Sequence, residues 1–206
     1  MWVSPYQLHW HSISTVFSGC SRNNVMTQNI IFIDSRVSNY QSLIDSLTEP
    51  AEVFILDAAW DGLAQMTAYL QGRSGIDAIH LISHGSQGAL YLGSTVLDSE
   101  RLASYRTPLA SIGSSLTESG DISLYGCNVA RGDTGLQFIT SLAQYTEADV
   151  AASTDATGAA AQGGIGCWSR RQVRLKHFLL CRPVTNRSYL MRVNPMAHEE
   201  RPMPSL

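Results

Sequence analysis

The chain has 206 residues, of which 44% are hydrophobic and 15% are charged. This composition predicts one globular domain with a full hydrophobic core, and it excludes disordered, collagen-like, coiled-coil and membrane-spanning proteins. Fourteen Lys and Arg against seventeen Asp and Glu give a net charge of −3. The chain as a whole therefore lacks the positive charge that a nucleic-acid-binding protein needs, and no nucleic-acid partner is expected.

The first segment, residues 1–28, is expected to be a disordered leader. It lacks the positively charged N-terminal region of a signal peptide, and His9 and His11 interrupt the apolar run that a signal peptide needs. The chain therefore shows no convincing signal peptide.

Short apolar runs without alternation follow, and these predict strands buried on both faces of a parallel sheet. They are NIIFID (29–34), EVFILD (52–57), AIHLIS (78–83), ISLYG (122–126) and DVAAS (149–153). Between them, apolar residues at helical spacing predict helices over 40–47, 63–70 and 136–143. The expected class is α/β, a three-layer α/β/α sandwich with a mostly parallel sheet.

The segment after the third strand is expected to fold differently. Residues 89–98 predict a small hairpin that turns at Gly93 and Ser94. A helix is expected to begin at Asp98 or Ser99, with a break or kink near Pro108.

Charge and cysteine content change along the chain. Residues 1–164 carry a net charge of −9, whereas residues 165–206 carry +6. Between residues 30 and 164 Cys127 is the only cysteine, which argues against a disulfide framework and singles this residue out.

Ligand sites in parallel sheets lie beyond the carboxyl ends of the strands. His84 follows the third predicted strand and Cys127 follows the fourth, so the two side chains could face each other. An imidazole raises the reactive fraction of a neighbouring thiol, which makes Cys127 a candidate nucleophile and His84 its base. Gly85 and Gly126 would let a substrate approach the backbone, and the N–H groups of Gly85 and Cys127 could hold an oxyanion.

Plainer interpretations of the same residues stay open. A cysteine after a buried strand is often a small hydrophobic residue, and a histidine beside glycine is often a turn residue. His80 is expected to be a core residue. Asp34, Asp57 and Asp155, which end or follow predicted strands, are equally ordinary as caps of turns or helices. No metal-ligand cluster, phosphate-binding loop or cofactor fingerprint is present in the sequence, so no metal or cofactor is expected.

A resemblance strengthens the catalytic interpretation. The stretches GIDAIHLISHGSQGALYLGSTVLDSERLASY and DISLYGCNVARGDTGLQFITSLAQYTEADVAASTDATGAAAQGG resemble the bacterial family called domain of unknown function 4347, over residues 29–164. Its HxxSHG and YGCN core is in turn similar to the caspase-like cysteine peptidase fold and its CHAT branch. The resemblance implies a caspase-like domain with His84 and Cys127 as a dyad and Gly85 as an oxyanion donor.

Function and location follow from the resemblance as expectations. The domain would be a cysteine endopeptidase acting on a polypeptide or on its own parent chain, with Asp155, and more weakly Asp57, reading a basic side chain of the substrate. Family members commonly begin long secreted or surface proteins, which implies a secreted or cell-surface setting. The alternative is a non-catalytic structural or interaction module of a large adhesin-like protein, or a truncated remnant of one. The oligomeric state is left open.

The tail, residues 165–206, departs from the family pattern at Ile165. The family continues with Asp-Trp and another strand, whereas this chain becomes basic. A shift of reading frame at Gly164 would restore DWLLESPPGSTEALLAVP for permitted codons, which makes the domain C-terminally incomplete here. A genuine basic extension is the alternative, and in either case we expect the tail to be poorly packed.

Overall fold

The computed structural model describes residues 28–47, 50–154 and 190–193, the last of these as backbone only. Its main sheet has six strands in the order β2-β1-β3-β7-β8-β9. The strands are β1 (Asn29–Asp34), β2 (Glu52–Leu56), β3 (Ile76–Ile82), β7 (Leu116–Tyr125), β8 (Asp149–Ser153) and β9 (Leu190–Val193). The first five are parallel to one another, and β9 is antiparallel to β8. The predicted α/β class with a mostly parallel sheet is confirmed.

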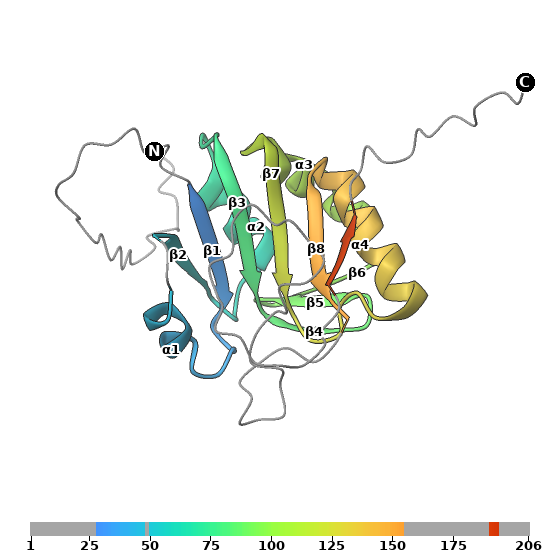
Figure 1. Cartoon of the computed structure of the whole chain (residues 1–206), viewed down its shortest axis with the longest axis horizontal. Helices are drawn as coiled ribbons and strands as arrows, with labels where there is room; N and C mark the ends of the chain where they lie inside the picture. The colour runs from blue at the N-terminus through green and yellow to red at the C-terminus, as the bar shows by residue number, and fades with distance from the viewer. Residues whose placement is uncertain (1–27, 48–49, 155–189, 194–206) are drawn as a thin grey trace, which may run out of the picture.

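Helices cover both faces of this sheet, as the three-layer prediction requires. The first face packs against α2 (Gly62–Leu70), α3 (Arg106–Ser114) and α4 (Gly132–Thr146), and Figure 1 shows α2 and α3 behind the strands. The other face packs Ile31, Ile33 and Ile82 against the short helix α1 (Tyr40–Asp45). Alternating side chains of each strand supply the two cores, because successive residues of a strand point to opposite faces.

A second, three-stranded sheet lies below the carboxyl ends of β3 and β7 in Figure 1. Its strands are β4 (His84–Ser86), β5 (Ala89–Leu92) and β6 (Thr95–Asp98), in antiparallel order. The predicted hairpin over 89–98 is confirmed, whereas the sequence analysis missed β4. Because β4 begins directly after β3, it places His84 at the rim of the main sheet.

The predicted helix start at Asp98 or Ser99 is wrong. The Asp98 carboxylate accepts the N–H of Arg101 at 3.0 Å and closes a turn instead. A short 3-10 helix, η1 (Leu102–Tyr105), comes next and continues directly into α3. Pro108 lies in the first turn of α3, where its missing N–H removes no helical hydrogen bond.

One short segment of the tail, residues 190–193, forms a strand that the sequence did not predict. These residues form β9 and pair with Val150 to Ser153 of β8. The leader and the remainder of the tail lie outside the described residues. Within the described ranges, no helix combines the length and apolar character needed to cross a bilayer.

Candidate active site

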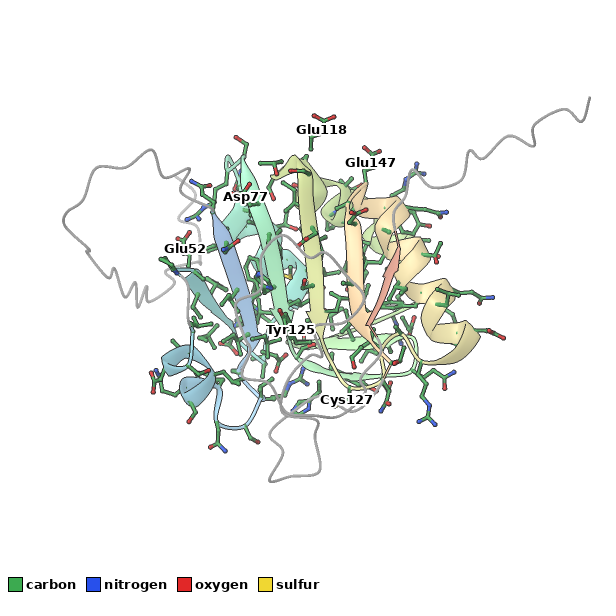
Figure 2. The ribbon with its side chains drawn as sticks, in the orientation of Figure 1. Glu52, Asp77, Glu118, Tyr125, Cys127 and Glu147 are labelled. Carbon is green, nitrogen blue, oxygen red and sulfur yellow. The ribbon has the colours of Figure 1, made fainter. Side chains whose placement is uncertain are left out.

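His84 and Cys127 lie at the same edge of the main sheet. Strands β3 and β7 are parallel neighbours whose last paired residues are Ile82 and Tyr125, and the two candidate residues follow two positions later on each chain segment. Figure 2 shows Cys127 just beyond the carboxyl end of β7, below Tyr125. The expected placement of both residues at one edge is confirmed.

The backbone segments that carry His84 and Cys127 pack closely. A Cβ at Gly85 would lie 3.4 Å from the carbonyl oxygen of Cys127, and a Cβ at Gly126 would lie 3.5 Å from the Cα of Gly85. The space beside both glycines is filled by Val129, whose Cγ2 would be 2.7 Å from a Gly85 Cβ and 2.8 Å from a Gly126 Cβ. These glycines therefore serve the close packing of two loops, and the side that a Cβ would occupy is not open to a substrate.

His84 is exposed, and a hydrogen bond to the main chain orients its ring. Its Nε2 lies 3.2 Å from the main-chain carbonyl oxygen of Arg36, in the loop between β1 and α1. A carbonyl oxygen can only accept a hydrogen bond, so Nε2 must carry the proton. In the neutral imidazole this leaves Nδ1 as the nitrogen that can accept a proton from a thiol.

Cys127 begins a tight turn at the end of β7. The thiol is half-buried, and Cys127 forms no disulfide within the described part of the chain. Asn128 has a left-handed backbone with a φ of 57°, and its carbonyl accepts the N–H of Arg131 at 3.0 Å. Asparagine tolerates this conformation better than most residues, and it turns the chain away from the strand directly after the thiol.

A buried carboxylate braces the loop that orients His84. The side chain of Asp34 is 0% exposed and accepts hydrogen bonds from the Nε, NH2 and main-chain N–H of Arg36, each at 2.9 Å. It also accepts the N–H of Gly93, in the turn between β5 and β6, at 2.7 Å. Burial acts to raise the pKa of Asp34, but the hydrogen bonds from Arg36 and Gly93 outweigh it and hold the pKa below its usual value.

The structure places two of the three remaining candidates, Asp57 and His80. Asp57 directly follows β2, which lies three strands from β7 and therefore about 14 Å away across the sheet. Its carboxylate closes a turn by accepting the N–H of Ala59 at 2.8 Å. Asp155 lies outside the described residues. His80 is buried, as expected of a core residue, and its Nδ1 lies 3.1 Å from the hydroxyl of Tyr125.

Acidic side chains gather at the opposite edge of the sheet. Figure 2 shows Glu52, Asp77, Glu118 and Glu147 at the amino ends of the parallel strands, away from Cys127. These four carboxylates therefore lie at the edge of the sheet opposite the thiol. Among the described residues, no three or more His, Cys, Asp or Glu side chains are grouped to hold a metal ion.

Two contributors to this arrangement escaped the sequence analysis. The acceptor for His84 is the main-chain carbonyl of Arg36, and a carbonyl leaves no trace in residue type. Asp34 was predicted only as the end of a strand and an ordinary cap of a turn or helix. An aspartate that ends a fully apolar run was the available signal for a buried, hydrogen-bonded carboxylate.

The family assignment rests on a match over most of the chain. Residues 30–177 match the family model described as Domain of unknown function (DUF4347), which is more than half of the chain. The chain belongs to this family. The DUF4347 match contains His84, Cys127 and Asp155, and it extends past Gly164, where we expected the resemblance to end.

Comparisons with curated proteins and with solved structures are less informative than the family match. No curated protein matches the DUF4347 chain. Among solved structures it is similar to the crystal structure of caspase-1 from Spodoptera frugiperda, with 15% sequence identity and a TM-score of 0.32. The match covers 55% of this chain and 56% of the caspase chain, so the DUF4347 chain spans just over half the length of that structure.

Proposed function

We propose that this DUF4347 domain is a cysteine endopeptidase in which Cys127 is the nucleophile and His84 is the general base. The observation that carries the proposal is the hydrogen bond from His84 Nε2 to the Arg36 carbonyl. It holds the ring in the tautomer whose Nδ1 can take a proton, at the sheet edge where the only cysteine of the described residues lies.

The reaction would be acyl transfer from a peptide bond. His84 Nδ1 takes the thiol proton, and Cys127 Sγ attacks the scissile carbonyl carbon. The N–H groups of Gly85 and Cys127 stabilise the oxyanion, and His84 then gives its proton to the leaving amine as the C–N bond breaks. Water, deprotonated by His84, attacks the resulting thioester, which releases the carboxylic acid and restores the thiol.

The substrate in this proposal is a polypeptide, and the parent chain is one candidate because a module within a longer protein meets its own flanking segments at high effective concentration. Asp155 follows β8 in sequence and is our candidate for reading a basic residue beside the scissile bond. Asp57 is the weaker candidate because of its distance from β7. We place the reaction in a secreted or surface protein, as the family resemblance implies.

Covalent trapping tests the proposal in the full chain with Cys20, Cys167 and Cys181 replaced by Ser. A peptidyl fluoromethyl ketone ending in arginine should form one adduct, on Cys127, as located by mass spectrometry of peptides. His84→Ala should slow adduct formation by about 100-fold or more, the usual contribution of a general base, and His177→Ala is the matched histidine control.

Equal labelling of the parent and His84→Ala would contradict the proposal. The non-catalytic structural or interaction module, or a remnant of a larger protein, would then be the better account of this chain.

A further inference from the structure

The buried carboxylate of Asp34 binds both structural parts that make the His84 contact. One part is the acceptor loop: Asp34 binds the guanidinium and the main-chain N–H of Arg36, whose carbonyl accepts from His84. The other part is the small sheet that carries His84. Asp34 accepts the N–H of Gly93, and β5, which ends at that turn, pairs Tyr91 with His84.

The turn between β5 and β6 requires a glycine at position 93 for a steric reason. Its φ is 57°, and a Cβ there would overlap the carbonyl oxygen of Trp60 and lie 2.8 Å from that of Asp57. The turn is thus held on one side by the β2–α2 loop and on the other by the Asp34 carboxylate, so its position relative to β1 is fixed.

We infer that Asp34 is a positioning residue that fixes the orientation and tautomer of His84. It does so by holding the Arg36 carbonyl and the three-stranded sheet in a fixed position relative to each other. This inference rests on the proposed function for its catalytic meaning. The geometric part concerns His84 alone and does not depend on the reactivity of Cys127.

The chain offers a closely matched control. Asp98 likewise binds both the main chain and the guanidinium of a nearby arginine, in a more exposed pair. Its Oδ1 accepts the Arg101 N–H at 3.0 Å and its Oδ2 accepts the Arg101 guanidinium at 2.8 Å. That pair lies at the far end of β6 and has no bond to Arg36 or His84 among the described residues. Asp98→Asn therefore removes an Asp–Arg pair of the same kind without disturbing the His84 contact.

The test measures the tautomer of His84 by long-range proton–nitrogen correlation NMR on the full chain at about pH 8.5, where an ordinary histidine is neutral. In the parent, the ratio of the Nε2-protonated to the Nδ1-protonated tautomer of His84 should be much higher than in the urea-denatured chain. Asp34→Asn should lower this ratio by about five-fold, which corresponds to one ordinary hydrogen bond. Asp98→Asn should leave it unchanged.

A second variant guards against misfolding of Asp34→Asn. Arg36→Lys keeps the charge beside Asp34 but cannot form the paired guanidinium contacts, and it should give a tautomer ratio between those of the parent and Asp34→Asn. If the tautomer ratio of His84 is the same as in the parent in whichever of Asp34→Asn and Arg36→Lys folds, the inference is overturned.

The alkylation rate of Cys127 separates this inference from the proposed function. If Asp34→Asn shifts the tautomer and slows alkylation by a similar factor, both stand. If the tautomer shifts while Cys127 is unreactive in the parent, the positioning role stands and the peptidase proposal fails.

Discussion

Single residues at the carboxyl edge of the sheet hold backbone conformations that other residues would resist. Asn128, with its φ of 57°, is the residue that follows the candidate nucleophile. A β-branched side chain in this region is costly, so Asn128→Val should lower the free energy of unfolding by about 2 kcal/mol. Asn128→Gly should change it by less than about 0.5 kcal/mol, and urea unfolding of both variants measures the difference. Equal losses would show that the Asn128 side chain, rather than its backbone, is what matters.

Asp34 should make stability depend on pH in a defined direction. Its folded pKa lies below the unfolded value of about 3.9, so its stabilisation is fully present above that value and is lost as the pH falls through the folded pKa. Asp34→Asn should therefore cost about 2 kcal/mol at pH 7, the usual size for hydrogen bonds to a charged group, and progressively less below about pH 4.

Urea unfolding of the parent and Asp34→Asn between about pH 7 and pH 3 checks this dependence. Asp98→Asn, which breaks an exposed pair, should cost no more than about 0.5 kcal/mol. A difference between the parent and Asp34→Asn that stays constant over this pH range would contradict the account.

Among the elements, the strands that sequence predicts best are those buried on both faces. The residue bounds of β1 and β8 agree with the prediction because their apolar runs are complete. The first half of β7, LTESGD, escaped prediction because it contains polar and glycine residues, and β4 escaped because His-Gly-Ser carries no strand signal. Their pairing partners, far away in sequence, make these segments strands.

The candidate site follows the same rule. The parallel arrangement of β3 and β7 made the shared edge of His84 and Cys127 predictable from apolar runs alone. The hydrogen bond to the Arg36 carbonyl was not predictable, since it depends on the path of a loop 48 residues away. Sequence thus indicates which residues share an edge of the sheet, whereas the main-chain group that orients His84 is known only from the structure.

Helices α3 and α4 approach each other at a glycine. A Cβ at Gly113 of α3 would overlap the carbonyl oxygen of Thr146, the last residue of α4, and backbone cannot move aside as a side chain can. Gly113→Ala should therefore destabilise the protein by about 2 kcal/mol, although alanine is the better helix former. Ser111→Ala, at an exposed position of the same helix, should stay within about 0.5 kcal/mol. Thermal unfolding of both variants tests this, and a stabilised Gly113→Ala would show that the helices can separate cheaply.

At the scale of the whole molecule, the charge divides at about residue 164, from −9 before it to +6 after it. We propose that a shift of reading frame at Gly164 produced this change. Resequencing the gene across that codon should then show a frame disruption. An intact frame, together with a tryptic peptide covering residues 175–182 from the purified protein, would end the proposal, and the pairing of β9 with β8 would then belong to a genuine extension.

The central claim is that His84 activates Cys127, and the alkylation rate of that thiol by iodoacetamide tests it most directly. With Cys20, Cys167 and Cys181 replaced by Ser, Cys127 should react at about pH 6 faster than a model thiol, because the thiolate is the reactive form. His84→Ala should remove this excess while the far-UV circular dichroism stays unchanged, since an exposed residue contributes little to the core. A rate no faster than the model thiol, and unaffected by His84→Ala, would contradict the account.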